Sequence, residues 1–223
     1  MTLPVIIFTI VYVLVLGAYF FTETSGKMYL RAPNKCLLAL MFFVFGCVVF
    51  TTSDKYNLTS YHGLLMAGLF LAMMGDIFLL FDFNRGGDFF LCGNVCFAIY
   101  HMSLLKDHGY GIGNYWWLIL IAAILVGLYY FLFTKFPNVF KIGAFKNPFV
   151  LYLASITLHG MMGISTLIFL PEFFLLGFGS VLFFISDLTL TLDKFVFRNK
   201  WSLRANSAFY FTGMLLIVLS MVL

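Results

Sequence analysis

The sequence predicts an all-α membrane protein: a single integral membrane domain over residues 1–223, built as a bundle of eight transmembrane helices. The first observation is composition, because 63% of the 223 residues are hydrophobic and only 10% are charged. An ordinary soluble domain has roughly 45–50% and 25%. The second is that apolar stretches of about 20 residues, the length that crosses a bilayer, fill nearly the whole chain. Together these observations exclude a soluble globular protein.

Apolar segments follow one another along the chain, and each predicts one helix. They cover residues 3–22, 34–52, 59–81, 89–106, 115–134, 148–169, 172–192 and 206–223. Polar residues, glycine and proline separate them and favour turns. The first segment lacks a basic leader and a small-residue cleavage site, so we expect a retained helix and not a signal peptide.

The third observation is the distribution of Lys and Arg among the predicted loops. All but two of the 13 basic residues, Lys55 and Lys106, fall in or beside the loops that follow odd-numbered segments. The positive-inside rule places these loops in the cytoplasm and both termini outside. No basic run offers a binding surface for nucleic acid. The absence of sorting motifs, tails and loop domains favours a bacterial inner (plasma) membrane.

Asp76 and Asp187 are the acidic residues that lie well inside predicted helices. A carboxylate in the membrane costs several kcal/mol unless it faces a polar interior, which makes each a candidate functional residue. Both lie about one and a half turns before the predicted cytoplasmic end of their helices, so we expect them at similar depth. The alternative is that each acid only hydrogen-bonds to hydroxyl groups on neighbouring helices.

Asp187 lies 111 residues after Asp76, which is half the chain length. A shift by this number lays the first four apolar segments over the last four. The offset favours a 4+4 parallel internal repeat, which would bring the two acids to corresponding positions beside a central cavity.

A few further polar residues are candidates for substrate binding. Lys35 heads the second segment and Tyr210 lies early in the eighth, both near the depth expected for the acids. Snorkelling for the lysine and an interfacial anchor for the tyrosine are their ordinary roles. Lys194 follows the seventh segment, and His101 in the fourth is either a core histidine or part of a polar cavity. His101 and His159 could be axial ligands of a haem, but no second feature supports that interpretation.

The third, fourth, seventh and eighth segments carry short motifs. They are Gly75-Asp76 followed by Gly93, Phe97 and His101; Leu182-Phe183 with Ser186-Asp187 and Lys194-Phe195; and Tyr210-Phe211 with Leu216-Ile217. These motifs, spread over nearly the whole chain, resemble those of the YhhN-like lysoplasmalogenase family of polytopic membrane vinyl-ether hydrolases.

The resemblance implies hydrolysis of the vinyl ether bond of a lysoplasmalogen, a 1-alkenyl-glycerophosphoethanolamine or -choline, to a fatty aldehyde and a glycerophospho-alcohol. This chemistry needs a positioned acid that protonates carbon and an anion that stabilises the resulting cation. Asp76 and Asp187 would form this acid–base pair, with either residue as the acid. Lys35 and, second to it, Lys194 would hold the lysophospholipid headgroup. The mechanism requires no cofactor and no metal; the partners are the substrate and the lipid bilayer, and the oligomeric state is not predicted.

A proton-coupled transporter of small molecules or lipids, using the same two acids, is the main alternative, because intramembrane acids and parallel repeats also occur in proton relays. Broken helices are typical of transporters, yet only Gly75 adjoins either acid and no proline interrupts their helices. A scaffold that packs against other membrane proteins would not need two acids at equal depth. The residues therefore favour an enzyme over both alternatives.

Overall fold

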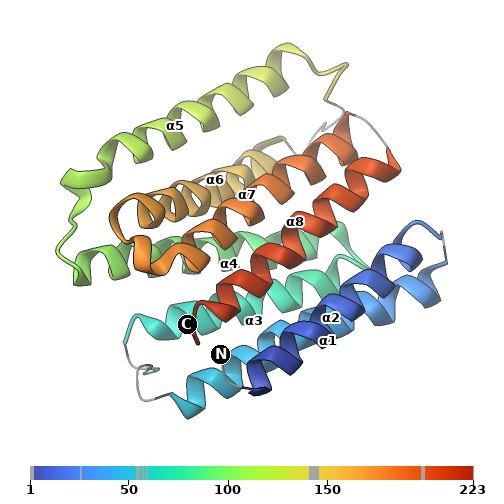
Figure 1. Cartoon of the computed structure of the whole chain (residues 1–223). Coiled ribbons are helices and arrows are strands. Elements are labelled where there is room, and N and C mark those ends of the chain that lie inside the picture. The colour runs from blue at the N-terminus through green and yellow to red at the C-terminus, as the bar shows by residue number, and fades with distance from the viewer. Residues whose placement is uncertain are drawn as a thin grey trace.

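In the computed structural model of the chain, the described residues form eight α-helices that lie side by side in one bundle (Figure 1). The structure describes residues 3–25, 27–53, 56, 58, 60–140, 146–196 and 199–222. The helices are α1 (Leu3–Glu23), α2 (Met28–Thr52), α3 (His62–Phe78), α4 (Phe83–Asp107), α5 (Ile112–Lys135), α6 (Lys146–Phe169), α7 (Phe174–Phe195) and α8 (Lys200–Leu219). One turn of 3₁₀ helix, Pro171–Phe173, joins α6 to α7. The described part contains no strand, so the predicted all-α fold is confirmed.

Seven of these helices are long and apolar enough to cross a membrane. The remaining helix, α3, has 17 residues, but hydrogen-bonded turns extend it, because the amide of Leu79 donates to the Gly75 carbonyl at 2.9 Å and that of Phe81 to the Phe78 carbonyl at 2.9 Å. The protein is therefore an integral multi-pass membrane protein.

Both ends of the chain lie at the same end of the bundle, as an even number of crossings requires (Figure 1). Their location outside the cell stays a prediction. Three of the basic residues counted for the orientation, Lys55, Lys141 and Arg198, lie outside the described residues.

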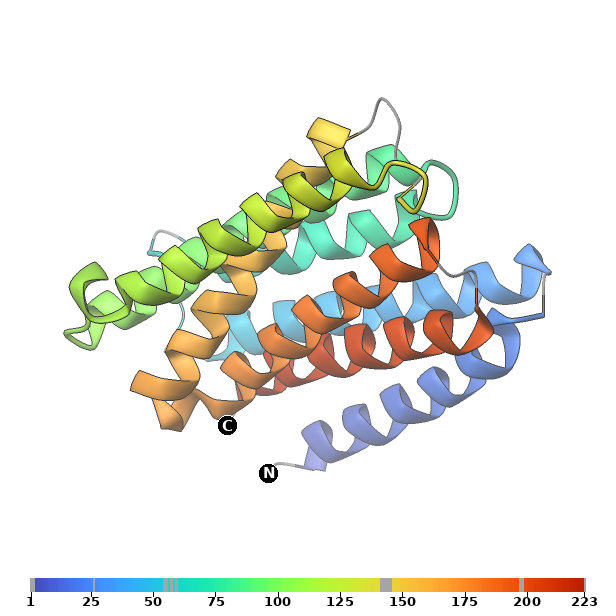
Figure 2. The same cartoon turned by 90° about the horizontal axis from the view of Figure 1, so that it is seen from above.

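The helices divide into a packed centre and a periphery. Helix α5 lies along the outside of the bundle and packs on α6, and α1 packs mainly on α2 (Figures 1 and 2). Helices α3, α4, α6, α7 and α8 share the most extensive contacts and carry most of the buried side chains. The site described below lies within this centre, and α2 adds one residue, Lys35, from its edge. The predicted internal repeat stays a prediction.

Three helices begin well before the predicted segments, and for α2 this changes the position of Lys35. Helices α2, α4 and α8 each start six residues before the corresponding apolar segment. Polar side chains can cap and continue a helix beyond its apolar part: the Asp82 carboxylate accepts from the amides of Asn84 and Arg85 before α4, and the Asn199 side chain accepts from the Trp201 amide before α8. Lys35 accordingly lies two turns inside α2. The predicted position at the head of this helix was wrong.

A glycine controls the packing beside Asp76. A Cβ atom at Gly75 would lie 2.7 Å from the Phe90 ring, so only glycine lets α4 approach α3 at this level. Gly179 and Gly213 play the same part between α7 and α8, since a Cβ on either would lie 2.7 Å from the other's carbonyl oxygen. Small residues are the usual means by which helix backbones approach closely in membranes.

Candidate active site

Asp76 lies at the meeting point of three helices. Its carboxylate is 2% exposed. Lys35 of α2 places its Nζ 3.1 Å from Oδ1, and the hydroxyl of Tyr210 of α8 donates to Oδ2 at 2.7 Å. A cation and a hydrogen-bond donor both favour the charged form of a carboxyl group. The structure thus brings together three predicted site residues, Lys35, Asp76 and Tyr210.

Asp187 has a different set of partners. It is 4% exposed, and the hydroxyl of Tyr152 of α6 donates to its Oδ2. Among the described residues no cation lies within ion-pair distance of it. The preceding residue, Ser186, accepts from the side-chain amide of Asn206 at its carbonyl (2.8 Å) and at its hydroxyl (2.9 Å), which ties α7 to α8 at this level.

The two carboxyl groups are close enough to interact electrostatically, and Asp76 also acts on the Tyr152 hydroxyl. Buried carboxyl groups that interact do not both hold a charge easily, so one proton can be shared by the pair. Within the described chain the only ion pair of either acid belongs to Asp76, so the two carboxyl groups have unequal surroundings. The arrangement can therefore present one anion and one acid to a bound molecule.

A pocket of about 410 Å³ opens between α4, α6 and α7, and Tyr152, the hydrogen-bond donor to Asp187, forms part of its wall. Its volume lies in the usual range for small-molecule sites. Its lining is mostly apolar and consists of Leu79, Phe83, Asn84, Gly87, Asp88, Phe90, Leu91, Pro148, Phe149, Tyr152, Leu190, Thr191, Lys194 and Phe195.

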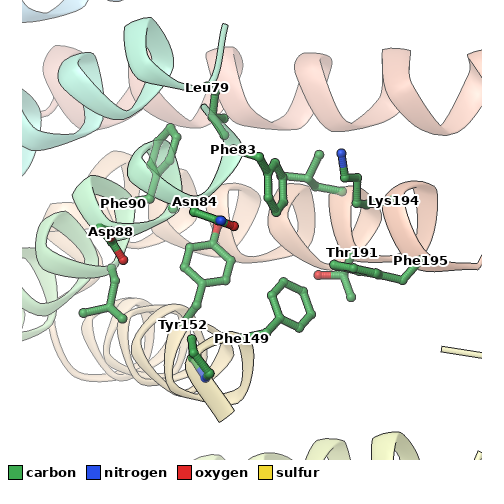
Figure 3. Close-up of a pocket in the computed structure, with 14 residues that line it drawn as sticks. Leu79, Phe83, Asn84, Asp88, Phe90, Phe149, Tyr152, Thr191, Lys194 and Phe195 are labelled. Carbon is green, nitrogen blue, oxygen red and sulfur yellow. The ribbon is translucent and has the colours of Figure 1, made fainter. Parts of the chain in front are cut away.

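Tyr152 connects the pocket to the carboxyl pair. Figure 3 shows its ring extending from α6 into the pocket, with Lys194 and Phe83 on the facing side. The Lys194 ammonium lies 4.5 Å from the centre of the Phe83 ring, a cation–π contact. Lys194 therefore belongs to the last turn of α7 and to the pocket, whereas Lys35 belongs to the carboxyl pair.

His101 is not brought to either acid. Its Nδ1 lies 2.7 Å from the Thr166 hydroxyl and its Nε2 2.9 Å from the Ser180 hydroxyl, in a fully buried network between α4, α6 and α7. His159 lies beside it, with ring centroids 5.7 Å apart, and its Nδ1 is 3.0 Å from the Asn94 side-chain oxygen. Among the described residues, no hydrogen bond of this network reaches Asp76 or Asp187.

The sequence reasoning missed Tyr152, Asn206 and Glu23. Tyr152 is one of 12 tyrosines in an aromatic-rich chain, and nothing in its neighbourhood in the sequence marks its hydroxyl. Glu23 falls at the end of an apolar segment, where an exposed loop residue was the simpler interpretation, but it is only 3% exposed. An acid directly at the end of a long apolar run is the one signal that could have found it.

The fold and site define a class: a multi-pass helical membrane protein with a pair of buried carboxyl groups beside an apolar pocket. The chain belongs to the YhhN family, which matches residues 30–221. It is also 32% identical over 167 residues to the Lysoplasmalogenase TMEM86A of Bos taurus, covering 71% of this chain. The matched part spans 65% of that relative's length. No solved structure matches the chain significantly.

Proposed function

We propose that the protein is a lysoplasmalogenase that hydrolyses the vinyl ether bond of a lysoplasmalogen within the membrane. The observation that carries the proposal is the unequal pair of buried carboxyl groups, Asp76 with a cation and Asp187 without one, beside an apolar pocket. Membership in the YhhN family and the likeness to a relative named as a lysoplasmalogenase support the substrate class.

The unequal partners assign the roles of the two acids in this proposal. Asp187, as the acid, transfers its proton to the β-carbon of the vinyl ether, and the double bond becomes an oxocarbenium ion. Asp76, as the anion, stabilises that cation. Water then adds to the α-carbon and returns a proton to Asp187, and the resulting hemiacetal separates into a fatty aldehyde and a glycerophospho-alcohol. One water is consumed and both acids recover their starting forms.

The pocket supplies a binding site for the alkenyl chain. Its walls are largely leucine and phenylalanine, and its inner side reaches Tyr152, which donates to Asp187. A chain in this pocket would hold its first carbons next to the proposed acid. Such positioning of a reactive bond accelerates a reaction by replacing a bimolecular encounter with a prearranged one.

Aldehyde release from a lysoplasmalogen by the purified protein in detergent tests the proposal. We expect release by the wild type, and a loss of about 10²–10⁴-fold in kcat in Asp187→Asn and in Asp76→Asn, the usual worth of acid–base catalysis. Asp107→Asn, the same change at an exposed position at the end of α4, is the matched control and should keep full activity. Near wild-type turnover in either folded site variant would contradict the assignment of that acid.

A proton-coupled transporter remains the second candidate, and the buried network of His101, His159 and Asn94 is the observation in its favour. Polar side chains inside a helix bundle can relay protons. Proton flux in liposomes holding the purified protein distinguishes the two. Flux abolished by His101→Ala, with no aldehyde formed by the wild type, would replace the enzyme by the transporter. The predicted bacterial inner membrane stays a prediction that cell fractionation can test.

A further inference from the structure

A second buried polar cluster lies where α1, α2 and α8 meet, next to the carboxyl pair. Its centre is Glu23, the last residue of α1, which is 3% exposed. The hydroxyl of Ser207 of α8 donates to its Oε1. Its other oxygen, Oε2, is buried and has no hydrogen bond of good geometry among the described residues, although the Tyr19 hydroxyl is near enough to act on the carboxyl group. A buried carboxylate with an unused oxygen is rare, because desolvation without compensation costs several kcal/mol.

Two arginines with unused donors accompany Glu23. The Nε atoms of Arg31 in α2 and of Arg204 in α8 are both buried without a hydrogen-bond partner in the described part of the chain. Arg204 directs another nitrogen, Nη2, to the Thr24 hydroxyl at 3.2 Å. Neither arginine forms an ion pair with Glu23, although Arg31 is near enough to interact with it electrostatically. The cluster thus holds unsatisfied groups of both charges.

The position of the cluster relates it to the proposed reaction. Arg31 precedes Lys35 by four residues on α2, so the two residues lie on the same helix face, with Cβ atoms about 5–6 Å apart. Lys35 is the partner of Asp76, and it also interacts electrostatically with Glu23. The cluster, on α1, α2 and α8, therefore adjoins the Lys35–Asp76 pair, whereas the pocket, lined mainly by α4, α6 and α7, reaches Asp187 through Tyr152.

The unused groups match a ligand that carries both an anion and an ammonium group. Guanidinium groups bind phosphate with paired, charge-assisted hydrogen bonds. A primary ammonium has three N–H donors and can donate to a free carboxylate oxygen. A phosphoethanolamine group contains both, separated by two carbons. A trimethylammonium group has no N–H and cannot donate to Glu23 Oε2.

We propose that Glu23, Arg31 and Arg204 form the headgroup subsite for a zwitterionic glycerophosphoethanolamine, with the phosphate on the arginines and the ammonium on Glu23. This inference rests on the proposed function. The substrate then spans the site: headgroup on this cluster, vinyl ether between Asp76 and Asp187, and alkenyl chain in the pocket.

A groove at the side of the bundle provides access to this subsite. It has a volume of about 480 Å³ and is lined by Phe20, Phe21, Trp201, Arg204, Ala205 and Ala208 of α1 and α8. Helix α1 touches α8 over only a few residues. A lipid in the bilayer can reach Arg204 along this aromatic and small-residue surface.

Binding of soluble headgroups tests the subsite without using the reaction. Trp201 lies 5.7 Å from the Arg204 guanidinium, measured from its ring centre, so its fluorescence can report binding of glycerophosphoethanolamine and of glycerol 3-phosphate to the full-length protein in detergent. We expect Glu23→Gln to weaken binding of glycerophosphoethanolamine about tenfold, the worth of one charge-assisted hydrogen bond. Binding of glycerol 3-phosphate, which has no ammonium, should not weaken. Arg31→Gln should weaken both.

Glu172→Gln and Arg85→Gln are the matched controls, since both residues are exposed and, in the described part of the chain, the one ion pair between them and other residues joins Arg85 to Asp82, outside the cluster. They should leave both affinities unchanged. Glu23→Gln keeps the size of the side chain and can still accept from Ser207, so it should fold. The proposed subsite would be refuted if Glu23→Gln weakened the binding of both ligands equally, or the binding of neither.

Kinetics separate this inference from the proposed function. With 1-alkenyl-glycerophosphoethanolamine, Glu23→Gln should raise KM about tenfold and leave kcat unchanged, which is the pattern of lost uniform binding. With the choline substrate the change should be small. Aldehyde release with an unchanged headgroup preference in Glu23→Gln would refute the subsite alone. Selective binding of glycerophosphoethanolamine without aldehyde from any substrate would keep the subsite and refute the lysoplasmalogenase.

Discussion

The surroundings of Asp76 and of Asp187 differ, although the sequence presents the two acids alike. Asp76 lies between α2 and α8 with a lysine and a tyrosine on its two oxygens. Asp187 accepts a hydrogen bond from the Tyr152 hydroxyl, and Tyr152 lines the pocket. The residues before them differ as well: Gly75 admits the Phe90 ring, whereas Ser186 accepts two hydrogen bonds from Asn206.

This difference shows that partners, more than residue type, give each carboxyl group its role. A cation beside a buried acid favours its charged form, and an acid without one keeps its proton more easily in an apolar environment. Pairs of carboxyl groups in glycosidases and aspartic proteases divide their tasks in the same way. Substitutions at matched positions on the two sides should therefore have unequal effects.

The largest difference should appear in the stability of the two Asn variants. Asp76→Asn leaves the buried Lys35 ammonium without a counter-charge, and breaking a buried ion pair costs about 3–5 kcal/mol. Asp187→Asn removes no ion pair and keeps an oxygen that accepts from Tyr152, so it should cost less than about 1 kcal/mol. Thermal unfolding in detergent measures both.

The double variant Lys35→Met with Asp76→Asn is the control for this explanation. It removes both charges and should recover most of the stability lost in Asp76→Asn, but none of the aldehyde release. A double variant as unstable as Asp76→Asn would mean that the ion pair is not the cause.

Removing the hydroxyl of Tyr152 or of Tyr210 should change kcat by different amounts, and this difference should be of intermediate size. Tyr152→Phe leaves Asp187 without its hydrogen-bond donor, whereas Tyr210→Phe leaves Asp76 its ion pair with Lys35. Since an ordinary hydrogen bond is worth about 0.5–1.5 kcal/mol, we expect Tyr152→Phe to lower kcat by up to about tenfold, and Tyr210→Phe to lower it less because the Lys35 ammonium still holds Asp76. Steady-state kinetics on both proteins measure this, and the reverse order would contradict the assignment of Asp187 as the acid.

The smallest difference between the two sides should come from exchanging the residues that precede the acids, because the two changes cost similar amounts of stability. Gly75→Ser places side-chain atoms against the Phe90 ring and should cost about 1–3 kcal/mol, the usual penalty for overpacking. Ser186→Gly loses one side-chain hydrogen bond from Asn206, about 0.5–1.5 kcal/mol, together with the cost of glycine in a helix of up to about 1 kcal/mol.

Gly127→Ser serves as the control for the first of these changes, because nothing lies within 4 Å of a Cβ at Gly127 on the outer helix α5. It should leave stability almost unchanged. If Gly75→Ser and Gly127→Ser have the same unfolding temperature as the wild type, Gly75 is not needed for the approach of α4.

The sequence by itself determined the membrane class, the number of helices and the two acids as candidates. These features are local, because a run of about 20 apolar residues must become a helix in a bilayer wherever it lies in the fold, and an acid inside such a run is visible at once. The predicted starts of α2, α4 and α8 were wrong because polar residues continue a helix beyond its apolar part. For the same reason the sequence did not show how far inside α2 Lys35 lies.

Only the tertiary structure decided which residues meet. Lys35, Asp76 and Tyr210 come from three helices separated by most of the chain, and their contact depends on how each helix is rotated in the bundle. The same packing joins Tyr152 to Asp187, directs His101 into a separate network and buries Glu23 beside Arg31. Side-chain partners across helices follow from close packing of many residues at once, and the pattern of a single segment does not contain that information.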